Sequence, residues 1–350
     1  MTNVYSIVPN VIWFTAFLQA SFTLVYFTLK RHQMLSLFAK WNAFELRLNV
    51  NVLNIGVYRN SKRVAAFMFV VYFLMTCYNS YSHSLKMFNK PEAPILLSHY
   101  DLLRQALSFD LIFVIHLIAG FYKWILITLS DVVPGIVFYY AAATLHFIEL
   151  LLKDDFEAPI RRPHLIKSVA DETSDSNELA PAVPEFKSPF CLRLRRTWSK
   201  YETFVDLVKQ TNDIFGSLMF LDHGIKFFLI CTVFAQFLSS FTDPNIHMLA
   251  PMSASLTFIF RYAASILLAA ELHHTSSETN ESALSLYSLN CFHMSRDERE
   301  IFNLFINRLK ESSLAARPLD LYSIDKGILL AIVSLTISYV IVVVQMHPSV

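Results

Sequence analysis

Residues 327–346 read GILLAIVSLTISYVIVVVQM, a run of twenty residues without a single Lys, Arg, Asp or Glu. A helix of about 20 apolar residues is long enough to cross the roughly 30 Å hydrocarbon core of a bilayer. In lipid the backbone polar groups must be paired within the segment, which a helix achieves. The run therefore predicts a transmembrane helix.

The rest of the chain has the same character. It is 350 residues long and 54% hydrophobic, with 31 Phe and only 16% charged residues, whereas a soluble domain carries about 25% charge. We predict an all-α, polytopic helical membrane protein, nominally with seven transmembrane helices and with cytoplasmic helix extensions. Besides 327–346, the apolar stretches are Val11–Leu29, Val64–Tyr81, Ala106–Tyr122, Val132–Leu152, Ile225–Phe241 and Leu249–Ala270.

Basic residues in the connections predict the orientation. The connection 30–63 carries seven Lys and Arg against the single acid Glu45, which favours the cytoplasm. The connection 240–248 and the tail 347–350 contain neither Lys nor Arg, which favours the outside. We therefore predict a multi-pass protein of the plasma membrane with an extracellular C-terminus.

These orientations conflict with seven crossings, because seven would place the basic connection outside. Either the stretches 106–122 and 132–152 form one long helix, or the basic connection departs from a statistical rule. We favour the single helix, because so basic a short connection is unusual outside.

The chain divides into membrane and cytoplasmic segments. Amphipathic stripes predict helices that extend into the cytoplasm, one from about 196 into the fifth span and one over about 297–312. The stripe of the second helix consists of Ile301, Leu304, Phe305 and Leu309. The predicted segments are 1–152 (first four apolar stretches), 153–213 (cytoplasmic, flexible over 171–189), 214–270 (fifth and sixth spans), 271–326 (cytoplasmic), 327–346 (last span) and 347–350 (extracellular tail).

Several motifs resemble those of insect gustatory receptors. Ser338–Met346 resembles the family signature Thr-Tyr, five apolar residues, Gln-Phe in the last span. Leu319–Asp325 resembles the turn Gly-Leu-Phe-x-Leu-Asp before that span, with Asp320 where Gly is usual. Asn212–Gly216 resembles the Ile-Asn-x-x-Phe-Gly element that opens the fifth span. Trp41–Glu45 resembles the W-x-x-x-E of the first cytoplasmic loop, which would make the first apolar run the family's second span.

The resemblance implies a tastant-gated, non-selective cation channel. It implies a homo- or heterotetramer with other gustatory receptors, an intracellular N-terminus and a central pore lined by the final helix. It also implies that the cytoplasmic extensions form the main subunit contact and that a sugar or a bitter compound binds in the outer half of each helix bundle.

The final helix supplies the predicted pore residues. We expect Gln345 to face the pore, because four amides on a symmetry axis replace part of an ion's hydration shell without trapping the ion. Val342 and Met346 are expected to form an apolar constriction, and Tyr339 either faces the pore or packs between helices. The alternative is that Gln345 only caps the helix at the interface.

Aromatic and charged residues of the spans suggest a ligand site. Trp124, Phe138 and Tyr139 lie near Asp131 in sequence, a combination that suits a small polar organic molecule. Arg261 lies within the sixth span, where an ionisable side chain is costly. Core packing of the aromatic residues, and a structural ion pair of Arg261, are the alternatives.

The charged residues of the spans are also candidates for ion pairs. Either Asp110 or Asp131 is expected to pair with Arg261. Asp222 and Lys226 are four residues apart, so they can pair on one helix face. We expect that pair in a solvated position at the cytoplasmic end of the fifth span.

Other function classes fit the sequence less well. A G-protein-coupled receptor would carry Asp-Arg-Tyr-like and Asn-Pro-x-x-Tyr motifs, and a secondary transporter would break its helices with Gly and Pro. An odorant receptor of the same superfamily is the nearest alternative. We expect no enzyme activity, no cofactor and no metal site, since His, Cys, Asp and Glu do not cluster in the sequence, and a net charge of +1 gives no indication of nucleic acid binding.

Overall fold

The computed structural model describes residues 4–48, parts of 63–78, and residues 109–161, 188–240, 249–312 and 314–346. Regular structure in these ranges is helical throughout. In chain order the helices are α1 (Val4–Arg47), α4 (Phe109–Arg161), α5 (Pro189–Ser240), α6 (Leu249–Asn290), α7 (Arg296–Glu311), the short 3-10 turn η4 (Pro318–Asp320) and α8 (Gly327–Met346).

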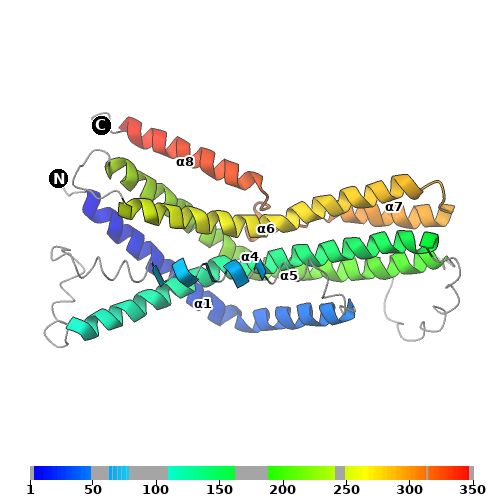
Figure 1. Cartoon of the computed structure of the whole chain (residues 1–350), viewed down its shortest axis with the longest axis horizontal. Helices are drawn as coiled ribbons and strands as arrows, with labels where there is room; N and C mark the ends of the chain where they lie inside the picture. The colour runs from blue at the N-terminus through cyan, green and yellow to red at the C-terminus, as the bar shows by residue number, and fades with distance from the viewer. Residues whose placement is uncertain are drawn as a thin grey trace.

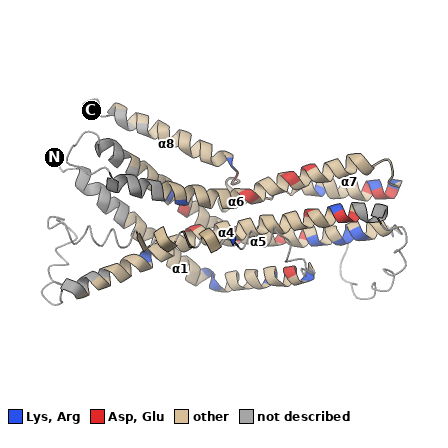
Figure 2. Cartoon of the chain, in the orientation of Figure 1, with Lys and Arg blue, Asp and Glu red and all other residues tan. Residues whose placement is uncertain are grey.

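The long helices form a bundle with two unlike halves (Figure 1). In one half α4, α5, α6 and α7 pack side by side, and we call this the extension half. In the other half the helices diverge, and both chain termini and α8 lie there; we call this the span half. Charged residues concentrate on the extension half, whereas α8 is uncharged and only Lys326, directly before it, carries a charge (Figure 2). This distribution is expected if the span half lies in lipid and the extension half in water.

The third apolar stretch, from Phe109 onward, and the fourth belong to a single helix, α4. The residues between them, 123–131, contain neither Gly nor Pro, so nothing in the backbone interrupts the helix. The two charged residues of this segment, Lys123 and Asp131, are buried within the bundle. The basic residues from Lys30 to Arg47, predicted to lie in a connection, belong to the second part of α1.

Two helical segments of the described part are long and apolar enough to cross a membrane, Leu117–Phe156 of α4 and Pro189–Thr232 of α5. Described positions of the second apolar stretch are helical, and Met68 from this stretch packs against Val132 of α4. The segment 171–189, predicted to be flexible, lies almost wholly outside the described residues, and the tail 347–350 lies wholly outside them.

The extension half has an aromatic core. Phe302 of α7 lies 4.7 Å from Phe156 of α4 and 5.8 Å from Tyr287 of α6, measured between ring centroids. Such edge-to-face and tilted pairs add stabilisation beyond that of area burial. These rings hold α7 against the extensions of α4 and α6.

α7 occupies the position of the predicted amphipathic helix. Ser295 caps it and forms a capping box with Glu298, which pairs two backbone N–H groups at the helix N-terminus. Ile301, Phe305 and Leu309 are buried as predicted, but Leu304 is exposed. That assignment was wrong because the buried face is centred one position away, on Phe302 and Ile306.

Candidate functional site

Four charged side chains from three helices meet inside the span half. Asp131 lies on α4, Asp222 and Lys226 lie on α5, and Arg261 lies on α6. Lys226 Nζ is 2.9 Å from Asp131 Oδ1 and 2.6 Å from Asp222 Oδ2, and Arg261 Nε donates to Asp131 Oδ2 at 2.8 Å. None of the four is more than 4% exposed. We call these residues the ionic cluster; its two acids and two bases balance.

Neutral polar groups complete the ionic cluster. Gln19 of α1 donates from Nε2 to Asp222 Oδ1 at 2.6 Å, and the Ser130 hydroxyl lies 3.2 Å from the same oxygen. Arg261 Nη2 lies 3.4 Å from the Thr128 hydroxyl. A buried carboxylate is tolerated only where several donors replace its water. Through Gln19 the cluster also joins α1, so it connects α1, α4, α5 and α6.

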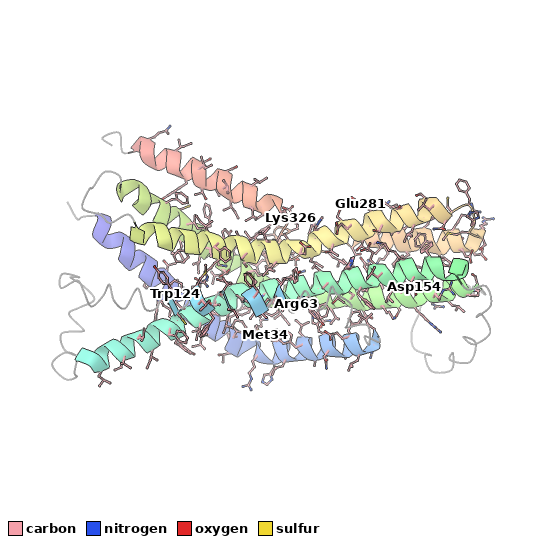
Figure 3. The ribbon with its side chains drawn as sticks, in the orientation of Figure 1. Met34, Arg63, Trp124, Asp154, Glu281 and Lys326 are labelled. Carbon is pink, nitrogen blue, oxygen red and sulfur yellow. The ribbon has the colours of Figure 1, made fainter. Side chains whose placement is uncertain are left out.

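Aromatic rings border the bases of the ionic cluster. The Arg261 guanidinium carbon lies 5.6 Å from the centroid of the Trp124 ring, and Lys226 Nζ lies 5.7 Å from that of Tyr262. Phe258 packs against Trp124 at 6.2 Å between centroids. Trp124 lies where the helices begin to diverge (Figure 3). Sites for small organic molecules combine such apolar rings with a few fixed polar groups.

Three of the residues predicted for a ligand site come together here, Trp124, Asp131 and Arg261. Of the two predicted partners of Arg261, Asp131 is the one bonded to it. Phe138 lies further along α4, is completely buried and belongs to the main hydrophobic core, as the core-packing alternative expects. Tyr139, next to it, is half-buried.

The solvated position predicted for Asp222 and Lys226 was wrong. The two side chains do pair on one face of α5, but both are buried in the ionic cluster. The prediction failed because the bases and acids that balance them come from α4 and α6, far away in sequence. The sequence analysis did not identify Gln19 as part of this site. The feature that could have indicated it is that Gln19 is the only amide side chain in the apolar run Val11–Leu29.

The predicted pore residues lie on α8, which contacts the bundle through α5 and α6. Tyr339 is 43% exposed and Val342 is 50% exposed, and Gln345 is also exposed. The side chain of Met346 lies outside the described part of the structure. In a single chain, therefore, most of α8 is available to lipid or to other subunits. Among the described residues, no group of three His, Cys, Asp or Glu side chains is arranged to hold a metal ion.

A family model described as the 7tm odorant receptor matches residues 3–336 of the sequence. The chain belongs to this odorant receptor family. Family members are multi-pass membrane proteins, which agrees with the long apolar helices described above. No curated protein matches this odorant receptor family member in sequence.

The fold of this family member is similar to two solved structures of the insect olfactory receptor OR5 from Machilis hrabei. One has a TM-score of 0.67 and 10% sequence identity, and covers 99% of this chain and 83% of the other. The second, in complex with eugenol, has a TM-score of 0.59 and 13% identity, with the same coverage. The predicted all-helical, polytopic membrane fold is thereby confirmed. The sequence predicted an insect gustatory receptor; the comparisons confirm the related odorant receptor family but not the gustatory assignment.

Proposed function

We propose that this odorant receptor family member is a chemosensory receptor that acts as a ligand-gated, non-selective cation channel. The observation that carries the proposal is α8, an uncharged helix whose Gln345 and Val342 face away from their own bundle. A helix with a polar amide on its exposed face gains from facing a water-filled axis instead of hydrocarbon. Four copies of the chain would supply such an axis.

In this proposal Gln345 forms the polar ring of the pore. Amide oxygens replace part of the hydration shell of a cation, yet hold it weakly enough for release. Val342, one turn earlier, and Met346 form the apolar constriction that closes the channel by dewetting, and Tyr339 packs near them. The C-terminus is then extracellular and the protein lies in the plasma membrane.

The ligand of the proposed channel is a small organic molecule bound beside the ionic cluster. Trp124 and Phe258 supply ring faces for the ligand, and the Asp131–Arg261 pair supplies polar atoms that are held in place by their mutual hydrogen bond. Phe138 and Tyr139, also predicted for this role, lie further along the same helix. The similar olfactory receptor has been solved in complex with eugenol, which supports a small organic molecule as the ligand.

The ligand class has two candidates. The sequence of Ser338–Met346, which resembles the gustatory signature, supports a tastant such as a sugar or a bitter compound. The family model and the solved structures support an odorant. Both classes act through the same channel, so one panel of compounds distinguishes them.

The test is electrical recording from cells that express the full chain, with sugars, bitter compounds and eugenol applied in turn. We expect a ligand-evoked cation current, and we expect Gln345→Ala to change its conductance or its relative permeability to cations. Ser338→Ala is the matched control, because this hydroxyl bonds within the helix to the carbonyl of Ser334 at 2.9 Å. A response that depends on a heterotrimeric G protein and carries no intrinsic current would refute the proposal.

A further inference from the structure

The linker between α7 and α8, Leu314–Lys326, is fastened to α5. The Asn212 side chain of α5 donates from Nδ2 to the carbonyl of Ala315 at 2.9 Å, and its Oδ1 accepts from the N–H of Arg317 at 2.7 Å. The Asn212 side-chain amide thus uses its donor and its acceptor at the same time, and both bond to the linker backbone.

Gly216, one turn further along α5, permits the close approach of the same linker. A Cβ atom at this position would lie 3.0 Å from the carbonyl oxygen of Arg317 and 3.1 Å from the backbone nitrogen of Leu319. Both atoms belong to the backbone, so a side chain at 216 would have to push the linker away. The missing side chain is therefore part of the contact.

His223 makes a third contact with the linker. Its Nδ1 lies 3.2 Å from the hydroxyl oxygen of Tyr322. Positions 212, 216 and 223 are spaced by four and seven residues, which places them on one face of a helix. We call Asn212, Gly216 and His223 the docking strip. The strip ends beside Asp222, a member of the ionic cluster.

The linker has a defined and locally strained backbone shape. Leu319 and Asp320 have φ values of 50° and 56°, in the left-handed region that residues other than Gly rarely adopt. The N–H of Ile324 donates to the carbonyl of Ala316 at 2.8 Å and closes the loop. Such a conformation persists where the surroundings hold it, and the docking strip is the surrounding structure.

The held linker leads directly into α8. Asp325 accepts from the N–H of Ile328 at 3.1 Å through Oδ1 and so caps the first turn of the helix. Tyr322 lies three residues before Asp325 in the sequence. The start of α8 is therefore tied to α5, and through Asp222 and Lys226 of α5 to the ionic cluster.

We propose that Asn212 is a positioning residue for α8: with Gly216 and His223 it clamps the linker on α5, so that a movement of α5 is transmitted to the start of α8. The two sequence motifs around Asn212 and Asp320 are then the two halves of one contact. The transmission part of this inference rests on the proposed channel function, whereas the clamp itself does not.

Hydrogen–deuterium exchange of the purified full chain tests the clamp. In Asn212→Ala and in Gly216→Ala, we expect the linker amides of Arg317 and Ile324 to exchange about fivefold faster than in the wild type, as the loss of one hydrogen bond implies. Gly224→Ala is the matched control on the same helix, because a Cβ atom at 224 meets nothing within 4 Å. Unchanged exchange of the linker in both variants would overturn the clamp.

Recording of the current without added ligand tests the transmission, with the amount of protein at the cell surface matched. We expect Asn212→Ala and Gly216→Ala to change the basal open probability severalfold, and Gly224→Ala to leave it unchanged. A merely structural clamp would alter exchange but not this current, and that result would overturn the positioning role. If wild type carries no current with any compound of the panel, the channel function fails while the exchange result still decides the clamp. Tyr322→Phe, which removes only the hydroxyl, gives the same two readouts if the α5 variants do not fold.

Discussion

The span half and the extension half each contain an arginine bonded to a carboxylate, in opposite surroundings. In the span half Arg261 and Asp131 have side chains that are 3% and 0% exposed. In the extension half Arg308 donates from Nε and Nη2 to the two oxygens of Glu202 at 2.7 and 2.9 Å, and these side chains are 38% and 36% exposed. Both pairs join a guanidinium to a carboxylate, but they differ in burial, and Asp131 is also shared with Lys226.

The difference shows what each pair contributes. An exposed pair exchanges water for a partner at little net gain, typically below about 1 kcal/mol. A buried pair repays the large desolvation cost of its charges only while both partners are present. The Arg261 pair therefore makes the arrangement of α4, α5 and α6 nearly obligatory, whereas the Arg308 pair only adjusts the fit of α7 on α5.

Breaking the buried pair should have the largest effect. Asp131→Asn removes the carboxylate shared by Arg261 and Lys226 and leaves two bases with one acid in the cluster. We expect a loss of about 3–5 kcal/mol in the free energy of unfolding. The measurement is the thermal unfolding midpoint of the detergent-purified chain, together with the fraction that elutes as a single species.

A double variant shows whether charge is the cause. Asp131→Leu combined with Arg261→Leu removes one acid and one base and leaves the pair of Asp222 and Lys226 intact. Replacement of both partners by apolar residues is often neutral, so we expect most of the stability to return. A double variant as unstable as Asp131→Asn would contradict the charge explanation and would point to shape.

Helix positions that depend on local sequence signals were predicted well. α7 was expected over about 297–312 and extends over Arg296–Glu311, because its amphipathic period and its capping box are local signals. The continuity of α4 followed from the charges of the connections. The start of α5 was placed near 196 instead of at Pro189, although Pro is favoured in the first turn of a helix.

The ionic cluster could be predicted only in pieces. The pairing of Asp222 with Lys226 followed from their spacing, but their burial depends on Asp131 and Arg261. No local pattern relates positions 131 and 261 or assigns Gln19 to them. Contacts among four helices arise from tertiary packing. The only indication of them in the sequence is the presence of polar residues in apolar spans, where such residues are energetically unfavourable.

The half-buried carboxylate of Glu298 should stabilise the fold by less than the buried pair and by more than the exposed pair. Glu298 of α7 accepts a hydrogen bond from the Ser188 hydroxyl before α5 and from the N–H of Ser295 at 2.9 Å. Partial burial tends to raise the pKa of Glu298, but these hydrogen bonds outweigh it and hold the pKa below the ordinary 4.5. The stabilisation is therefore present above about pH 4.5 and is lost as the pH falls through the lower pKa of the folded state.

Glu298→Gln tests this sign. Gln keeps the capping geometry but not the charge, so we expect a loss of about 0.5–1 kcal/mol at pH 7, reduced by solvent screening. The unfolding midpoint, measured from pH 7 down to about pH 3.5, should show the difference between wild type and variant shrinking on the acid side. A difference that grows on acidification would contradict the direction of the pKa shift.

The exposed pair should give the smallest effect and the clearest dependence on salt. Glu202→Gln keeps an acceptor for the Trp198 indole N–H, which bonds to Glu202 Oε1 at 2.9 Å, and removes only the charge that faces Arg308. We expect a loss of about 0.3–0.5 kcal/mol at low salt, and none in about 1 M salt, where the screening length falls to about 3 Å. Asp131→Asn, in contrast, should remain destabilising in the same salt, because ions do not enter its surroundings. Equal salt dependence of the two variants would mean that burial does not separate the pairs.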